Sequence, residues 1–221
     1  AACLIPYTVL TPVATVYVKP TLAQLENGVF DFTATATLSN GCTASQLISV
    51  TNTSKVWQNT ASTDWNDPNN WKPLGVPTAS TCVIVPNNTI ISGSGYNAYA
   101  KNVTIKPTGT LNIMSDNNLT VTDWVNIDTG GVFNLKNNAS LVQINNASNT
   151  VTGTFNMERI SQPMNNVDYT YWGSPVASAF TLGTLSPSST ALYTWTPSVG
   201  GVSGNWVFAP LATVMTPGKG Y

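Results

Sequence analysis

The side chains best suited to chemistry in this chain are the oxygen-bearing groups of one short loop. Asp64, Asn66, Asp67 and Asn69 alternate within the tryptophan-rich segment 57–71. Alternate Asp and Asn side chains in a tight loop present the oxygen ligands that calcium takes. The same residues also favour turns, because their side chains bond the neighbouring backbone. The segment therefore predicts either a calcium site or a turn framework that needs no ion.

Catalytic groups of the common kinds are missing. The chain contains no histidine, so a serine or cysteine nucleophile would lack its usual general base. Glycan hydrolases and lyases need clustered carboxylates or a basic residue beside acidic ones. The acids of the repetitive segment described below do not recur in register; they are Asp116, Asp123, Asp128 and Glu158. We expect no catalytic residues, no enzymatic activity and no cofactor apart from the calcium considered above.

Aromatic residues near the end of the chain form a second candidate site. Trp172, Trp195 and Trp206, together with Tyr171, could build a platform on which sugar rings stack. Aromatic faces bind pyranose rings through apolar contact. Aromatic residues on short strands also fill the core of their own module. The sequence leaves both interpretations open.

Composition limits the partners. The 221 residues are 42% hydrophobic and only 8% charged, with a net charge of -1. Nucleic acid is excluded as a partner, because phosphate binding needs a basic face. No apolar run approaches about 18 residues, so we expect no transmembrane segment. The chain starts at Ala1 without an apolar leader, so we expect that any signal peptide has been removed.

The middle of the chain contains a repeat of 22 residues. The residues in register are the glycines Gly109, Gly131 and Gly153, the apolar Leu111, Phe133 and Phe155, and the amides Asn112, Asn134 and Asn156. Short alternating apolar runs at this period predict a parallel β-solenoid, in which equivalent residues stack about 4.8 Å apart. We expect the apolar set to form an inward column and the glycines to mark a corner. The asparagines predict either an outer amide ladder or a ligand-binding strip. Gln143 interrupts an apolar column, and a one-residue slip that turns Leu141 and Ile144 inward would accommodate it.

The beginning of the chain predicts a β-hairpin. Residues 29–38 alternate apolar and polar side chains, and a second apolar run ends at Val50. Asn40 and Gly41 between them favour a type I′ turn, in which both residues adopt positive φ.

Four segments of the sequence resemble parts of large surface proteins of the Bacteroidota. Ala-Thr-Ala-Thr-Leu-Ser-Asn-Gly-Cys-Thr-Ala, from residue 34, resembles the last two strands of their immunoglobulin-like repeats. The segment 57–71 resembles the opening of their solenoid domains. Tyr-Thr-Tyr-Trp-Gly-Ser-Pro-Val and Pro-Gly-Lys-Gly-Tyr resemble the module that follows the solenoid in flavobacterial proteins exported by the type IX secretion system. The resemblance implies an adhesin-like, multidomain extracellular protein.

The three cysteines fit that location. Cys3, Cys42 and Cys82 are too widely spaced for a zinc cluster, and secreted chains oxidise their thiols. Cys3 and Cys42 both lie in the first unit, so we expect a disulfide between them and an unpaired Cys82.

We therefore expect an all-β chain in three parts. Residues 1–53 form an immunoglobulin-like sandwich unit, truncated or reduced relative to a full domain of roughly 100 residues. Residues 54–160 form a short right-handed parallel β-helix of about 22 residues per coil, opened by a Trp-rich cap. Residues 161–221 form an aromatic-rich β module that ends within a strand.

The expected function is a non-enzymatic structural or adhesive segment of a secreted or cell-surface protein, serving adhesion, surface assembly or gliding motility. Its partners would be other domains or copies of the same protein and surface glycans. The alternative is a carbohydrate-binding module of a secreted glycan-degrading protein.

Overall fold

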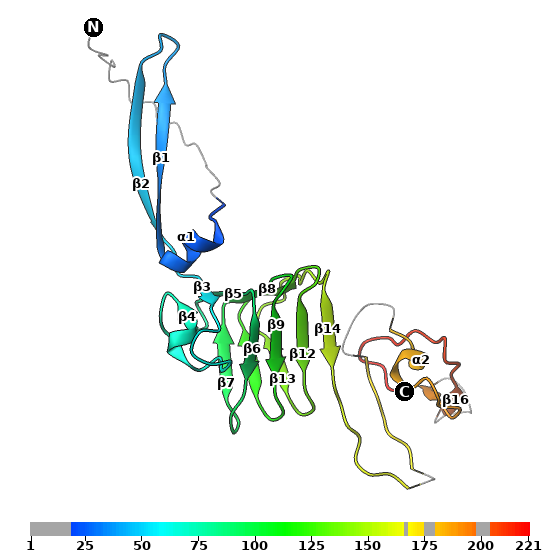
Figure 1. Ribbon diagram of the computed structural model, residues 1–221. Coiled ribbons are helices and arrows are strands. Elements are labelled where there is room, and N and C mark those ends of the chain that lie inside the picture. The colour runs from blue at the N-terminus through cyan, green and yellow to red at the C-terminus, as the bar shows by residue number, and fades with distance from the viewer. Residues whose placement is uncertain (1–18, 166–167, 175–179, 198–203) are drawn as a thin grey trace. The chain divides into compact units, whose positions relative to one another are not determined.

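The structure is a computed structural model that describes residues 19–165, 168–174, 180–197 and 204–221 (Figure 1). Strands hold 40% of the residues and helices 7%, which confirms the all-β prediction. The chain divides into two compact units, residues 1–160 and 161–221. In the part that the structure describes, no helix is long and apolar enough to cross a membrane.

The first unit opens with a short helix and a hairpin. Helix α1 (Leu22–Asn27) begins with a capping box, in which Thr21 and Gln24 each bond the other's backbone N–H. Strands β1 (Val29–Thr37) and β2 (Thr43–Thr51) pair antiparallel along their whole length. The predicted hairpin is confirmed. The predicted immunoglobulin-like sandwich remains a prediction, because residues 1–18 lie outside the described ranges.

The predicted type I′ turn of this hairpin is wrong. The backbone N–H of Leu38 donates to the carbonyl of Cys42 across 2.8 Å, so the turn has three residues, 39–41, between this bonded pair. Gly41 has a φ of 83°, whereas Asn40 is not among the residues with positive φ. A three-residue connection needs only one left-handed residue, at its last position, and glycine supplies it without strain.

The solenoid consists of three parallel sheets whose strands stack coil upon coil (Figure 1). One sheet contains β11 (Val125–Ile127), β8 (Asn102–Ile105), β5 (Cys82–Val85) and β3 (Lys55–Trp57), edged by the antiparallel β4 (Trp71–Lys72), which follows the 3₁₀ turn η1 (Pro68–Asn70). The second contains β14 (Thr154–Met157), β12 (Val132–Leu135), β9 (Thr110–Ile113) and β6 (Asn88–Ile91). The third contains β13 (Ser140–Gln143), β10 (Asn118–Val121) and β7 (Asn97–Ala100).

The strand register confirms the repeat. Val132 pairs with Thr110 on one side and with Thr154 on the other, each 22 residues away. The first coil is less regular, because Cys82 pairs with Asn102, which is only 20 residues further along. About three turns of about 22 residues make up the solenoid.

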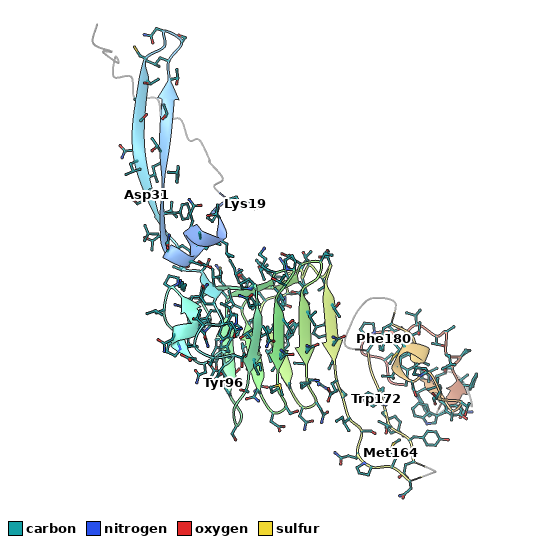
Figure 2. The ribbon with its side chains drawn as sticks, in the orientation of Figure 1. Lys19, Asp31, Tyr96, Met164, Trp172 and Phe180 are labelled. Atoms are coloured by element: carbon teal, nitrogen blue, oxygen red, sulfur yellow. The ribbon has the colours of Figure 1, made fainter. Side chains whose placement is uncertain are left out.

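The interior of the solenoid is one apolar core (Figure 2). Leu111 and Phe133 are fully buried in the predicted column, and Phe155 packs on them at the last coil. The corner glycine is required by this stacking. A Cβ on Gly109 would lie 2.0 Å from the carbonyl oxygen of Val85 in the preceding coil.

The predicted slip at Gln143 is wrong. Val121 pairs directly with Gln143, and Ile144 is 62% exposed rather than turned inward. Gln143 satisfies its amide locally instead, donating to the carbonyls of Asn145 and Ala147. A polar residue is tolerated in the column because it lies in the last coil and bonds its own loop.

An amide ladder runs along the outside of the second sheet. Asn112 donates to Asn88 across 3.0 Å, Asn134 to Asn112 across 2.8 Å, and Asn156 to Asn134 across 2.8 Å. The ladder therefore starts one coil earlier than the sequence indicated. Because each amide bonds the next, the column favours the structural interpretation over a ligand-binding strip.

The second unit has its own small core. Strands β15 (Tyr193–Thr196) and β16 (Asn205–Phe208) pair antiparallel, and helix α2 (Leu182–Leu185) precedes them. Leu182, Ala209 and Met215 are buried together, with Trp172 packed against them.

Candidate functional site

The calcium candidates lie in one loop, and hydrogen bonds within that loop engage both carboxylates. Asp64 Oδ1 accepts from the backbone of Asn66 across 3.0 Å. Asp67 Oδ1 accepts from the backbone of Asn69 across 3.0 Å, and its Oδ2 accepts from Ser62. The backbone N–H of Asn69, and secondarily the side chains of Ser62 and Asn69, hold the pKa of the Asp67 carboxyl below its usual value. The residues act as turn caps here, and calcium binding stays a prediction.

Asn70 organises this loop, and the sequence analysis missed it. Its side chain is fully buried, and its Oδ1 accepts from the backbones of Ala61 and Ser62 at 2.8 and 3.0 Å. Its amide also donates to the Ser62 hydroxyl and the Asp64 carbonyl. The loop is thereby fixed around a buried amide. Over the described ranges, no three His, Cys, Asp or Glu residues cluster as a metal site would require.

Three of the four acids of the coils are paired with stacked neighbours. Lys106 Nζ bonds Asp128 across 3.1 Å, and Lys136 Nζ bonds Glu158 across 2.9 Å. Asp123 accepts from the amide of Asn145 across 2.8 Å. Each partner is 22 residues away along the chain, so these carboxylates are spread over successive coils.

The predicted aromatic site has the clearest geometry. Trp195 and Trp206 face each other across β15 and β16, with ring centroids 5.4 Å apart. Tyr171 is also a neighbour of Trp206, with ring centroids 5.7 Å apart and an interplanar angle of 38°. Trp195 and Trp206 are each 41% exposed and Tyr171 is 71% exposed. These rings therefore do not fill the core of their module.

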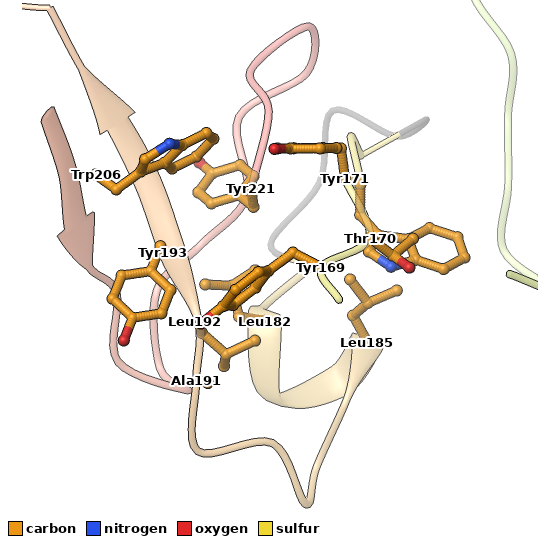
Figure 3. Close-up of a pocket in the computed structure, with 11 residues that line it drawn as sticks. Tyr169, Thr170, Tyr171, Leu182, Leu185, Ala191, Leu192, Tyr193, Trp206 and Tyr221 are labelled. Atoms are coloured by element: carbon orange, nitrogen blue, oxygen red, sulfur yellow. The ribbon is translucent and has the colours of Figure 1, made fainter. Parts of the chain in front are cut away.

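A pocket of about 250 Å³ opens beside this aromatic surface (Figure 3). Its aromatic lining consists of Tyr169, Tyr171, Trp172, Tyr193, Trp206 and Tyr221. Its remaining lining consists of Thr170, Leu182, Leu185, Ala191 and Leu192. The backbones of Trp172 and Tyr221 exchange two hydrogen bonds, of 2.8 and 2.9 Å, which hold the last residue at the pocket.

The structure brings two of the three predicted tryptophans into the pocket. Trp172 and Trp206 line it, whereas Trp195 lies beside it on the sheet. The sequence analysis missed the contributions of Tyr169, Tyr193 and Tyr221. The alternation Tyr-Thr-Tyr at 169–171 is the signal that could have found Tyr169, since residues i and i+2 of an extended segment share a face.

The pocket carries no charge of its own. The second unit contains one acid, Asp168, and one base, Lys219. Neither lines the pocket, and the Lys219 ammonium lies 5.6 Å from the ring centroid of Tyr221. The hydroxyls of Tyr169, Tyr171 and Tyr193 form no hydrogen bond with any part of the chain that the structure describes. The site therefore combines aromatic faces, an aliphatic lining and tyrosine hydroxyls that no other group of the described chain engages.

Of the cysteines, Cys42 is disulfide-bonded and Cys82 carries a free thiol. Cys3 lies outside the described residues. The specific pairing of Cys3 with Cys42 therefore stays a prediction.

In comparisons with known proteins, the chain matches one family model. The model of DUF8693, a domain of unknown function, matches residues 56–221, which is well over half of the chain. The match covers the solenoid and the whole second unit. No match to the chain was found among curated proteins or solved structures.

Proposed function

The chain belongs to the DUF8693 family, and we propose for it the role of a non-enzymatic, adhesive segment of a secreted or cell-surface protein. The solenoid is the scaffold, and the aromatic surface of the second unit is the part that contacts a partner. Copies or other domains of the same protein and surface glycans are the partners that this role requires.

One observation carries the proposal: three of the four acids of the regular coils, Asp123, Asp128 and Glu158, bond residues of a neighbouring coil. Asp128 and Glu158 are each bonded to a lysine one coil earlier, at 3.1 and 2.9 Å. Catalysis on a glycan needs two or three carboxylates converging on one bond. Asp128 and Glu158 instead pair singly with residues of the neighbouring coil, an arrangement that supports a structural role for the solenoid.

Secretion is part of the same proposal. The disulfide at Cys42 supports an oxidising compartment. The resemblance to flavobacterial surface proteins favours export by the type IX system, a first unit of immunoglobulin-like type and a role in adhesion or gliding. Right-handed coils fit the general preference of parallel crossover connections.

A bead assay tests the adhesive function. Beads coated with the full chain are placed on surfaces coated with the same chain, cellulose, chitin or alginate, and are then detached by flow. We expect attachment that resists flow on at least one surface and no soluble sugar released from any. Beads coated with the reduced and denatured chain are the control. Attachment no stronger than that control on every surface would overturn the proposal.

A carbohydrate-binding module is the second candidate. The 41% exposure of both Trp195 and Trp206 favours it, because core tryptophans of a self-contained module would be buried. The two candidates share the aromatic surface and differ in whether the parent protein degrades the glycan.

A further inference from the structure

We propose that the aromatic pocket of the second unit binds an uncharged oligosaccharide, with one pyranose ring seated against Tyr171 and Trp206 (Figure 3). The assignment deepens the adhesive function proposed above and rests on it, because it names the ligand that the surface would hold. Four features of the pocket lead to this ligand class.

The first feature is the arrangement of the rings. Tyr171 and Trp206 are neighbours, 5.7 Å apart, whose planes are inclined by 38° rather than stacked flat. Their faces form a bent surface with open sides. One face of a pyranose presents C–H groups, which make favourable contact with aromatic faces.

The second feature is the aliphatic part of the lining. Leu185 and Leu192, both half-buried, line the same pocket. They offer apolar contact to the ring carbons of a sugar and no hydrogen bond to its hydroxyls. The hydroxyls of the sugar must therefore point towards the hydroxyls of the tyrosines in the pocket lining.

The third feature is the set of tyrosine hydroxyls. Tyr169, Tyr171 and Tyr193 carry hydroxyls that have no partner within the described part of the chain. A purely apolar ligand would leave them without a partner in the complex, which costs free energy. A sugar hydroxyl can both donate to them and accept from them. The pocket therefore suits a ligand that is apolar on one face and hydroxylated at its edge.

The fourth feature is the absence of cations. Acidic sugars require an arginine or lysine to pair with the carboxylate. The lysine of this unit, Lys219, is placed over the Tyr221 ring and does not line the pocket. The ligand is consequently neutral.

An adjoining hollow extends the site. It measures about 480 Å³, shares Tyr169, Thr170 and Tyr171 with the pocket, and adds Gln162, Met164 and Asp168. Gln162 and Asp168 provide hydrogen-bonding groups for further hydroxyls. A chain of several sugars can therefore occupy both hollows around the Tyr169 to Tyr171 segment.

Calorimetric titration of the full chain with neutral hexasaccharides tests the assignment. The panel contains gluco-, xylo-, manno-, galacto- and chito-oligosaccharides, with oligogalacturonate and oligomannuronate as charged counterparts. We expect saturable binding of at least one neutral member and none of the charged ones. Tyr171→Ala and Trp206→Ala should each weaken binding about tenfold or more.

Phe208→Ala is the matched control. Phe208 is 58% exposed on the same sheet face as Trp206, but it does not line the pocket, so binding should stay within about twofold. Tyr171→Phe keeps the ring and removes the hydroxyl, so it should weaken binding severalfold without disturbing the fold. This variant keeps the test valid if Trp206→Ala unfolds.

Three results would overturn the assignment: no neutral saccharide bound, equal loss in Phe208→Ala and Trp206→Ala, or tighter binding of the charged counterparts. If the chain still attaches to chain-coated surfaces in the bead assay while no saccharide binds, the adhesive function stands and only this ligand is wrong. If attachment fails everywhere but a neutral saccharide binds, the pocket assignment stands and adhesion is wrong.

Discussion

The side-chain amide of Asn134 donates to Oδ1 of Asn112, which lies 22 residues earlier, across 2.8 Å. Asn134 in turn accepts from Asn156 across 2.8 Å. Asn134 thus bonds the preceding coil through its amide nitrogen and the following coil through its Oδ1. Substitution of Asn134 therefore tests how much this ladder stabilises the stacked coils of the proposed scaffold.

Replacing Asn134 with alanine removes both of these bonds. We expect the free energy of unfolding to fall by about 1 to 2 kcal/mol, because each lost hydrogen bond contributes about 1 ± 0.5 kcal/mol. Asn156→Ala, at the end of the ladder, removes one bond and should cost about half as much. Urea unfolding followed by circular dichroism measures both. Equal losses in the two variants would argue against a continuous ladder.

A methyl group at Gly109 should be far more disruptive. Gly109→Ala would place its Cβ 2.0 Å from the carbonyl of Val85, so the coils must separate locally. We expect a loss of about 3 kcal/mol or more in the free energy of unfolding, at the upper end of overpacking effects. Gly220→Ala is the control, since nothing lies within 4 Å of its Cβ position. A Gly109→Ala variant as stable as the parent would contradict the observed stacking at the corner.

Two tryptophans of the Trp-rich cap allow a matched comparison of substitutions with and without loss of a hydrogen bond. Trp65 and Trp71 are fully buried, with ring centroids 4.7 Å apart. Trp71 Nε1 donates to the Trp65 carbonyl across 2.8 Å, whereas Trp65 Nε1 has no partner. Replacement with phenylalanine removes similar volume in both cases, so Trp71→Phe should cost about 1 kcal/mol more than Trp65→Phe. Thermal unfolding of the two variants measures the difference, and the reverse order would contradict it.

The ion pairs between coils should contribute little. The Lys136 and Glu158 side chains are 41% and 46% exposed, so water screens their attraction. A double-mutant cycle with Lys136→Met and Glu158→Gln should give a coupling of about 0.5 kcal/mol or less. The cycle is run at low and high salt, and the coupling should shrink as salt rises. A coupling above about 1.5 kcal/mol would show that this pair is a principal source of stability.

The solenoid could be predicted because stacking imposes one residue type on successive coils. Leu111, Phe133 and Phe155 had to be apolar in every coil, so the period was visible in the sequence. The pocket could not be predicted as a whole. Its lining comes from Tyr169, Leu182, Tyr193 and Tyr221, in segments that do not repeat and that meet only through the tertiary fold.

Two local errors have the same origin. Asn40 and Gly41 are compatible with more than one turn, and the length of the connection decided between them. Gln143 looked like a break in the core column, but its amide bonds the loop that closes the last coil. In both places the outcome depended on hydrogen bonds to backbone groups whose positions the residue types alone do not specify.

Incubation of the full chain with polygalacturonate and alginate, followed by the size distribution of each polymer, tests the non-enzymatic claim most directly. Because no three acidic groups cluster in the part of the chain that the structure describes, we predict that both polymers keep their original length. Calcium is included in a parallel incubation, so that a calcium-dependent cleavage activity is also tested. A progressive shortening of either polymer would contradict the account and would identify the chain as a glycan-degrading enzyme.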